Sequence, residues 1–210
     1  MKKKKVFVVG NAKYYADFLK EFTHVDKLEE ANVVIFTGGE DVTPSIYGCK
    51  KHPRTYCNKF RDEEEKKVFE QIKENQLVLG ICRGSQFLCA MNGGYLVQHC
   101  SNHAIGKTHE ITNGTMGYQI TSTHHQMQYP YNLDKQDYDV LYWAAPMSEF
   151  WEGDKIDANE ILHHGEPEIV LYHKAGRPKC LAVQGHPEMI PNSPVAEMIN
   201  SLVDQYVSSK

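Results

Sequence analysis

Short apolar runs alternate with longer amphipathic stretches in the first part of the chain. The apolar runs predict strands over residues 6–9, 33–37 and 77–81, and the amphipathic spacing predicts helices over residues 12–22 and 61–75. An alternation of strand and helix is typical of a parallel sheet whose faces are covered by helices.

After about residue 100 the apolar runs become shorter, and they favour an antiparallel extension of the same sheet. The runs cover residues 118–122, 140–144, 169–173 and 181–184. Ser193 and Pro194 then begin a helix expected to reach residue 206, because serine is a good N-cap and proline suits the first helical turn. We therefore expect one α/β domain over residues 1–210, with an open, mostly parallel sheet flanked by helices and a smaller antiparallel extension.

A cysteine lies between two glycines where the strand over residues 77–81 gives way to a helical pattern. The local sequence is Gly80-Ile81-Cys82-Arg83-Gly84. A nucleophile on such a sharp turn needs neighbours without side chains, and the helix that follows points its N-terminus at the sulfur, which favours the thiolate. The pattern fits a catalytic cysteine, and it also fits a buried cysteine at the end of a core strand.

A second apolar strand runs directly into a histidine and a glutamate two positions apart, His186 and Glu188. Residues i and i+2 at a strand end project to the same side, so Glu188 can bind one imidazole nitrogen and aim the other at a thiol. A surface turn would give the same short sequence. The two patterns in one small chain favour a cysteine nucleophile with a histidine base.

Further blocks of sequence resemble a known family. They are the loop TGGEDVTPSIYG over residues 37–48, Arg61-Asp62, GGYLVQ over residues 93–98, STHHQ over residues 122–126 and QGHPE over residues 184–188. In these blocks and in their order the chain resembles class I glutamine amidotransferases, and more narrowly the γ-glutamyl hydrolase branch, peptidase family C26. The resemblance implies a flavodoxin-like fold.

The resemblance also implies roles for individual residues. Cys82 would be the nucleophile, His186 the general base and then acid, and Glu188 the residue that orients His186. The backbone N–H groups of Gly39 and Arg83 would form the oxyanion hole.

Residues that would hold the α-amino and α-carboxylate groups of a glutamyl substrate are Gln86, Ser122 and His124. The chain departs from the pattern of this branch at two positions. Thr121 stands where asparagine is usual, and Gly185 where tryptophan is common.

The implied activity is cysteine-dependent hydrolysis of γ-glutamyl amide bonds, which releases glutamate and an amine through a γ-glutamyl thioester on Cys82 and needs no cofactor. Two alternatives remain open. The chain could be the glutaminase subunit of an amidotransferase that delivers ammonia to a separate synthase, or a non-catalytic binding protein with the same fold. Nothing in the sequence specifies the amine that leaves.

Composition excludes some classes of partner. The chain has 210 residues and a formal net charge of −4, with charges spread along its length, so no nucleic-acid footprint is expected. The lysine run over residues 2–5 precedes an apolar stretch too short for a signal-peptide core or a membrane span. We expect a cytoplasmic protein with a solvated N-terminus.

Six cysteines show no C-x-x-C pairing and are expected to be free thiols, with Cys89 a small core residue. Eleven histidines include the sets His99 with His103, His124 with His125, and His163 with His164. Because no cysteine or carboxylate spacing completes a tetrahedral set around them, no metal is expected.

Two segments suit contact with a ligand. The stretch over residues 38–60 is a long loop beside the proposed nucleophile, and such loops commonly bind rather than merely connect. Residues 143–167 mix aromatic and acidic side chains too irregularly for a clean strand or helix. This segment suits a flap over the leaving group, or a solvated hairpin anchored by a few aromatics.

Overall fold

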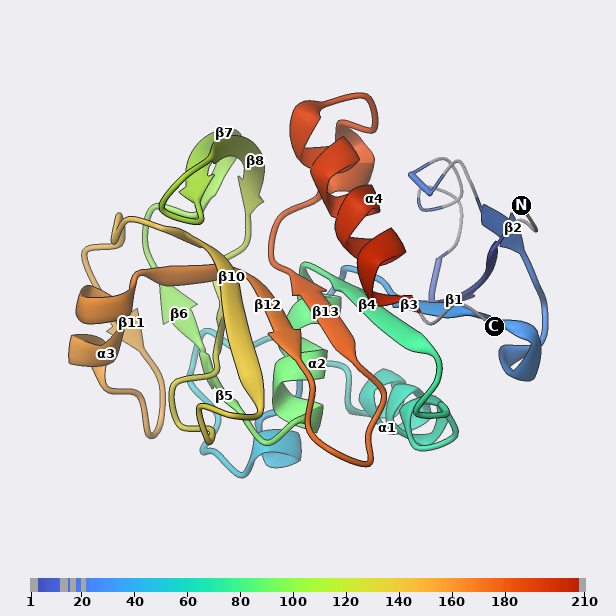
Figure 1. Ribbon diagram of the computed structural model, residues 1–210. Coiled ribbons are helices and arrows are strands. Elements are labelled where there is room, and N and C mark those ends of the chain that lie inside the picture. The colour runs from blue at the N-terminus through green and yellow to red at the C-terminus, as the bar shows by residue number, and fades with distance from the viewer. Residues whose placement is uncertain (1–3, 12–14, 16–17, 20–21, 208–210) are drawn as a thin grey trace.

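A nine-stranded sheet forms the centre of the molecule (Figure 1). The computed structural model describes residues 4–11, 15, 18–19 and 22–207. The strands, in spatial order, are β2 (Phe22–His24), β1 (Lys4–Val9), β3 (Val33–Phe36), β4 (Leu77–Ile81), β13 (Cys180–Val183), β12 (Glu166–Tyr172), β10 (Tyr138–Ala144), β7 (Ala104–Thr112) and β8 (Gly117–Thr123). The strands from β2 to β13 are parallel, and the other four are added antiparallel.

The three central strands β3, β4 and β13 are buried along their whole length. Strands covered on both faces need continuous apolar runs, which is why the sequence indicated them clearly. One expectation is corrected here. We expected the run over residues 181–184 in the antiparallel extension, but β13 pairs parallel with β4 and antiparallel with β12. The strand that leads to His186 is therefore the direct neighbour of the strand that leads to Cys82.

Helices cover both faces of the parallel half (Figure 1). Helix α4 (Pro194–Tyr206) lies on one face, where its apolar side packs with Val33 and Ile35 of β3. Helices α1 (Lys59–Phe69) and α2 (Arg83–Met91) lie on the other face, where they pack with Val34 and Phe36. Alternate residues of one strand thus belong to two different cores, as the two-residue period of a strand requires.

The helix that starts at Ser193 is confirmed. The Ser193 side chain accepts a hydrogen bond from the Ala196 N–H, and Pro194 is the first helical residue. The helix expected over residues 61–75 is shorter than predicted, because α1 ends at Phe69. Beyond it, the Gln76 side-chain oxygen accepts from the Lys73 N–H and its NH₂ group donates to the carbonyls of Leu28 and Ala31, which turns the chain into β4.

The helix expected over residues 12–22 lies mostly outside the described residues, as does half of the lysine run over residues 2–5. The long loop over residues 38–60 is interrupted by a 3-10 helix, η3 (Pro44–Tyr47), and the first turn of α1. Two other 3-10 helices are η2 (Leu28–Glu30) and η4 (Pro187–Met189).

The segment over residues 143–167 is more regular than expected. It contains β11 (Trp151–Glu152), which pairs with β6 (His99–Cys100), and helix α3 (Ala158–His164). A further pair joins β5 (Tyr95–Val97) to β9 (Met127–Tyr129). Buried side chains of these elements, with Tyr131, form a third apolar cluster. Among the described helices, none is long and apolar enough to cross a membrane.

Candidate functional site

Cys82 occupies the sharp turn between β4 and α2. Its φ is 52° and its ψ is −109°, a conformation that costs a non-glycine residue free energy and is typical of a nucleophile elbow. The Cys82 N–H donates to the Val183 carbonyl of β13 at 2.8 Å, which ties the turn to the neighbouring strand. The side chain is 8% exposed.

The two flanking glycines are required by close packing. A Cβ at Gly80 would lie 2.5 Å from the Gly84 carbonyl oxygen, and a Cβ at Gly84 would lie 2.1 Å from the Phe36 carbonyl oxygen of β3. Neither contact can relax without moving backbone. The G-x-Cys-x-G spacing therefore has the steric cause expected from the sequence.

His186 and Glu188 follow the end of β13, beside the turn that carries Cys82. His186 Nδ1 lies 2.6 Å from Glu188 Oε1, and both side chains are mostly buried. A Cβ at Gly38 would lie 3.0 Å from His186 Cε1 and 3.7 Å from Cys82 Cβ, so the imidazole and the cysteine meet at the same glycine.

The surroundings of His186 favour its protonated form. Burial alone would lower the pKa of His186, but hydrogen bonds with Cys82 and Glu188 and the negative charge of both groups raise that pKa to about 10. An imidazole that holds its proton at neutral pH beside a cysteine can donate it to a departing group.

A cavity of about 210 Å³ opens beside the cysteine, with Cys82, Gly39, Arg83, Gln86 and His124 among its lining residues. A second cavity of about 390 Å³ lies beside His186 and Glu188, and Gly39 borders both. The sequence-predicted residues other than Ser122 are thus distributed around two adjoining cavities.

The loop that carries Gly38 and Gly39 is held from two sides. Arg61 on α1 donates to the Gly38 carbonyl at 3.0 Å and pairs with Glu40 at 2.8 Å. On the other side the Gly38 N–H donates to the Tyr15 hydroxyl at 2.9 Å. Gly39 has a φ of +144°, and a Cβ there would lie 2.1 Å from Arg61 Nη1, so glycine is required.

Sequence reasoning gave no role to Tyr15 or to the Arg61 side chain. Burial, followed by the charge of Glu188, raises the pKa of Tyr15 and keeps its hydroxyl protonated. No sequence pattern marked Tyr15. Arg61 was noted only as part of the Arg61-Asp62 block. Its position in the first turn of α1 was the signal that could have indicated its role.

The Arg83 side chain has a structural function. It is 1% exposed and forms buried ion pairs with Asp62 and Glu65 of α1. Asp62 also accepts from the Thr43 N–H at 2.8 Å, so the same carboxylate positions the loop after Gly39. The Arg83 backbone N–H lies at the start of α2, where the N–H groups of a helix have no acceptor within the helix.

The three residues expected to bind substrate are placed differently. Gln86 Nε2 and His124 Nδ1 both donate to the Gln126 carbonyl, each at 2.9 Å, and both residues line the smaller cavity. The Ser122 hydroxyl is fully buried and donates to the His103 carbonyl at 2.7 Å, away from the residues that line the cavity.

The two departures from the family pattern are explained by local packing. The Thr121 hydroxyl accepts from the His186 N–H at 2.6 Å, so it helps to position the histidine. A Cβ at Gly185 would lie 2.4 Å from Ile120 Cγ1, so the Ile120 side chain fills the space that a larger residue at 185 would need.

All six cysteines are free thiols, as expected from the sequence. Burial raises the pKa of Cys89 to about 12 and that of Cys180 to about 12, which makes both unreactive at neutral pH. Cys89 is fully buried in the α2 core, as its place in the sequence predicted.

The fold also assembles a polar group that the sequence did not indicate. His103, His109 and Glu168 are buried, and atoms of theirs that can bind a metal lie within 4.8 Å of one another. His103 and His109 lie six residues apart, but Glu168 is distant in the sequence, so spacing along the chain did not indicate the group.

Comparisons with known proteins give a family match. Residues 19–134 match the family described as Peptidase C26. A candidate glutamine amidotransferase of Mycobacterium tuberculosis is 28% identical over 163 residues, which are 77% of this chain and 52% of that protein. The chain spans about half the length of the curated relatives it matches.

Solved structures share the fold. A protein of Thermoplasma acidophilum, described as a candidate subunit of GMP synthase, has a TM-score of 0.61 at 17% identity, with 98% of this chain and 96% of that chain covered. A glutamine amidotransferase of Thermotoga maritima has a TM-score of 0.55 at 16% identity, with 98% and 86% covered. At these identities the likeness concerns the fold alone.

Proposed function

Because the chain belongs to the peptidase C26 family, we propose that it is a cysteine-dependent hydrolase of γ-glutamyl amide bonds. Its catalytic residues are Cys82, His186 and Glu188. The observation that carries the proposal is the meeting of a cysteine on a strained turn with a hydrogen-bonded His–Glu pair, at the ends of two adjacent parallel strands.

The first half-reaction starts from a Cys82 thiolate and a protonated His186. The thiolate attacks the carbonyl carbon of the substrate side-chain amide, a C–S bond forms, and negative charge moves to the carbonyl oxygen. The backbone N–H groups of Gly39 and Arg83 stabilise that oxyanion. When the C–N bond breaks, His186 gives its proton to the leaving nitrogen, and a γ-glutamyl thioester remains on Cys82.

The second half-reaction returns the enzyme to its starting state. Neutral His186 takes a proton from water, and the hydroxide formed attacks the thioester carbonyl. Collapse of this second intermediate breaks the C–S bond, releases glutamate and restores the thiolate beside protonated His186. Glu188 holds the imidazole in place through both steps. The raised pKa of His186 supports this starting state, because the proton lies on the group that must later donate it.

Gln86 and His124 are proposed to border the α-amino and α-carboxylate groups of the glutamyl unit. A cavity of about 210 Å³ suits one such unit and little more, so the amine half must extend out of it. Ser122 is proposed to hold the segment over residues 122–126 in place, because its hydroxyl is already used by His103.

A glutaminase subunit that delivers ammonia to a separate synthase remains the second candidate. The favouring observation is that the T. acidophilum structure, described as a candidate synthase subunit, covers 98% of this chain. A free-standing hydrolase should release glutamate unaided, whereas a subunit of that kind stays slow until its partner docks.

The two candidates are separated by assaying the purified protein alone. Glutamate release would be measured with glutamine, with γ-glutamyl conjugates of alkylamines and polyamines, and with γ-glutamyl p-nitroanilide, using Cys82→Ala as the blank. Turnover of at least one conjugate well above that of glutamine supports the hydrolase. Turnover of glutamine alone that rises when a synthase is added establishes the subunit. No turnover and no acyl-enzyme by mass spectrometry would leave the non-catalytic binding protein.

A further inference from the structure

Three histidines surround one buried glutamate at the junction between the β7–β8 hairpin and β12. Glu168 Oε1 lies 2.9 Å from His109 Nε2, 3.8 Å from His124 Nε2 and 4.0 Å from His103 Nδ1. All four residues are less than a tenth exposed. His103 directly precedes β7, His109 lies in the middle of β7, His124 directly follows β8, and the glutamate comes from β12.

Partners on the outer side of two of these rings fix which nitrogen carries the proton. His124 Nδ1 lies 2.9 Å from the Gln126 carbonyl, which can only accept, so Nδ1 donates. His103 Nε2 lies 2.9 Å from Glu166 Oε2, and Glu166 also accepts from the Met147 N–H, the Ser148 N–H and Trp151 Nε1. A carboxylate with three such donors is ionised, so His103 Nε2 donates as well.

The inner nitrogens of His103 and His124 therefore face Glu168, and on a neutral ring each presents a lone pair there; His103 Nδ1 also lies 3.3 Å from the Ser122 hydroxyl. Histidines that bind a metal commonly have this arrangement, with the outer N–H bound to a carboxylate or a carbonyl. Here, however, the lone pairs face another acceptor. His124 Nε2 and Glu168 Oε2 are buried without a hydrogen-bond partner among the described residues. Acceptors that face one another in a buried site indicate that a proton or another positive centre belongs between them.

The charge count points the same way. Glu166 and Glu168 are 0% and 1% exposed, so their negative charge needs positive charge beside it, carried by protons on the histidines or by a metal ion. A divalent cation among the four side chains would supply two positive charges and use the inner lone pairs. Three imidazole nitrogens and one carboxylate oxygen form a donor set that suits zinc in tetrahedral geometry.

We propose that His103, His109, His124 and Glu168 bind a zinc ion. All four positions are filled by protein atoms, so the site is closed and its role is structural. The β7–β8 hairpin joins the rest of the sheet through a single residue pair, Trp143 with Thr112. Zinc would link this hairpin directly to β12 and would fix the His124 ring, which borders the cavity beside Cys82.

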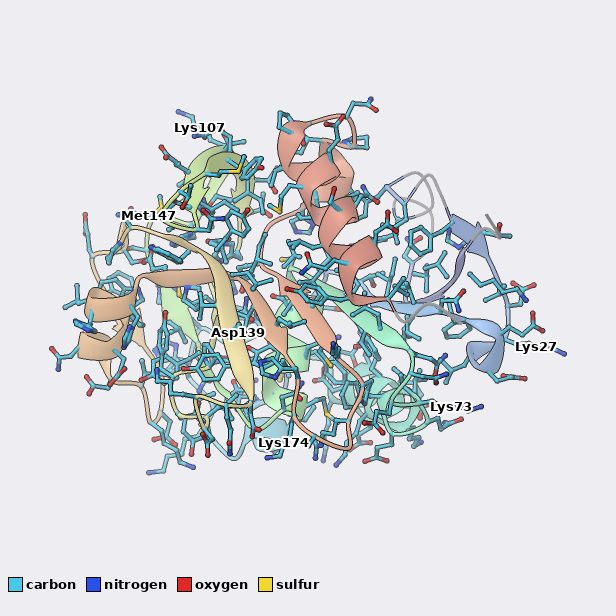
Figure 2. The ribbon with its side chains drawn as sticks, viewed as in Figure 1. Lys27, Lys73, Lys107, Asp139, Met147 and Lys174 are labelled. Carbon is cyan, nitrogen blue, oxygen red and sulfur yellow. The ribbon has the colours of Figure 1, made fainter. Side chains whose placement is uncertain are left out.

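Position in the fold explains why such a link matters. Figure 1 shows the β7–β8 hairpin at the far end of the sheet from β1, and Figure 2 shows Lys107 of β7 at the edge of the molecule. The first residues of β7, 104–108, are exposed, so this end of the hairpin has little buried apolar surface to keep it in place. A metal at its base is the cross-link that this geometry provides.

The test uses the full chain, purified without a histidine tag and dialysed without chelator. Elemental analysis should find about one zinc per chain. Cobalt, exchanged for zinc, should give the visible spectrum of a tetrahedral ion without the strong charge-transfer bands of thiolate ligands. His109→Gln and Glu168→Gln should lose the metal. His99→Gln, which alters a histidine outside the group, and Cys82→Ala should keep it.

Several outcomes overturn the proposal. Protein that holds less than about a tenth of an equivalent of metal, and takes up none from added zinc against a micromolar chelator, shows that protons balance the carboxylates instead. Loss of metal in Cys82→Ala, or thiolate bands in the cobalt protein, moves the metal to a cysteine. If the ligand variants fail to fold by circular dichroism, the stoichiometry and cobalt spectrum of the unaltered chain still decide.

Discussion

His186 Nδ1 lies 2.6 Å from Glu188 Oε1, with only Pro187 between the two residues in the chain. The proline begins the 3-10 helix η4, which brings the carboxylate back toward the ring. The tautomer and the direction of the imidazole are therefore set within three residues. His186 keeps its other nitrogen free to act on Cys82.

The first prediction separates the roles of these two residues. His186→Asn should lower kcat for glutamate release by roughly 10⁴-fold or more, whereas Glu188→Gln should cost roughly a hundredfold less, because an amide can still accept a hydrogen bond from the ring. Steady-state kinetics on one γ-glutamyl substrate measure both. Equal losses would show that Glu188 does more than orient the histidine.

The second prediction concerns which thiol reacts. Cys82→Ala should abolish glutamate release, and Cys89→Ala should retain it. In the unaltered chain iodoacetamide at pH 7 should label Cys82 before Cys89, because burial raises the pKa of Cys89 to about 12.

Labelling should also depend on the base. His186→Asn should slow alkylation of Cys82, because the imidazole no longer favours the thiolate. Peptide mapping by mass spectrometry gives the rates at each cysteine. An unchanged rate at Cys82 would mean that His186 does not activate it.

The third prediction concerns stability and pH. The pKa of His186 is raised from 6.5 to about 10, mainly by Cys82 and Glu188, which outweigh burial, and Tyr15 also lies beside this group. Protonated His186 therefore stabilises the fold fully below about pH 6.5, and this contribution is lost as the pH rises through about 10.

Urea unfolding at pH 7 and pH 10 tests this prediction. The free energy of unfolding of the unaltered chain, minus that of His186→Gln, should be larger at pH 7 than at pH 10. Taking the difference removes the titration of groups common to both proteins. A difference that stays constant, or that grows toward pH 10, would contradict the assigned pKa.

The fourth prediction tests the packing of Gly185 against Ile120. Gly185→Ala should lower the free energy of unfolding by about 1–3 kcal/mol, because its Cβ would lie 2.4 Å from Ile120 Cγ1. In the double variant with Ile120→Ala much of that added cost should disappear, although the Thr121 carbonyl at 2.8 Å remains close. Ile111→Ala, equally buried on β7, should combine additively with Gly185→Ala. Additivity in both pairs would remove the steric explanation.

The strands that carry the catalytic candidates were predictable because they are buried on both faces. β4 was predicted with its observed bounds, and its apolar run leads directly into Cys82. β7 was missed, because its first five residues are exposed and its sequence includes Gly106 and Lys107. The turn that follows α1 was also missed, since the Gln76 hydrogen bonds that direct the chain into β4 reach residues more than forty positions away.

The site divides in the same way. The need for glycine at position 80 has a local cause, its approach to the Gly84 carbonyl, so the sequence indicated the turn at Cys82. Contacts between distant segments have no local cause in the sequence. The use of the Ser122 hydroxyl by His103, the bond from Gly38 to Tyr15, and the approach of His109 to Glu168 depend on tertiary packing that no motif encodes.

The last prediction concerns Phe150 and Trp151, which lie in the segment over residues 143–167 that the sequence suggested as a flap over the leaving group. Trp151 Nε1 donates to Glu166 Oε1 at 2.9 Å and the residue pairs with Cys100, so Trp151→Ala should destabilise the protein instead. Phe150 is 37% exposed, and its ring lies 5.1 Å from that of His99, which neighbours His125 at the rim of the smaller cavity. Phe150 is therefore the residue of the two that is placed to meet an amine extending from that cavity.

If the protein is a γ-glutamyl hydrolase, Phe150→Ala should raise KM about fivefold for a conjugate with an aromatic or extended amine, because a lost aromatic contact is worth about 1 kcal/mol. KM for glutamine should stay unchanged, because the ammonia that leaves from glutamine cannot reach the Phe150 ring. Leu162→Ala, which removes an exposed side chain on α3, is the matched control and should change neither value. Kinetics on both substrates, with melting temperatures to exclude unfolding, give the comparison. Equal shifts in KM for glutamine and the conjugate, or no shift in either KM, would show that Phe150 does not contact the amine. The specificity for the amine would then have to come from the larger cavity beside Glu188.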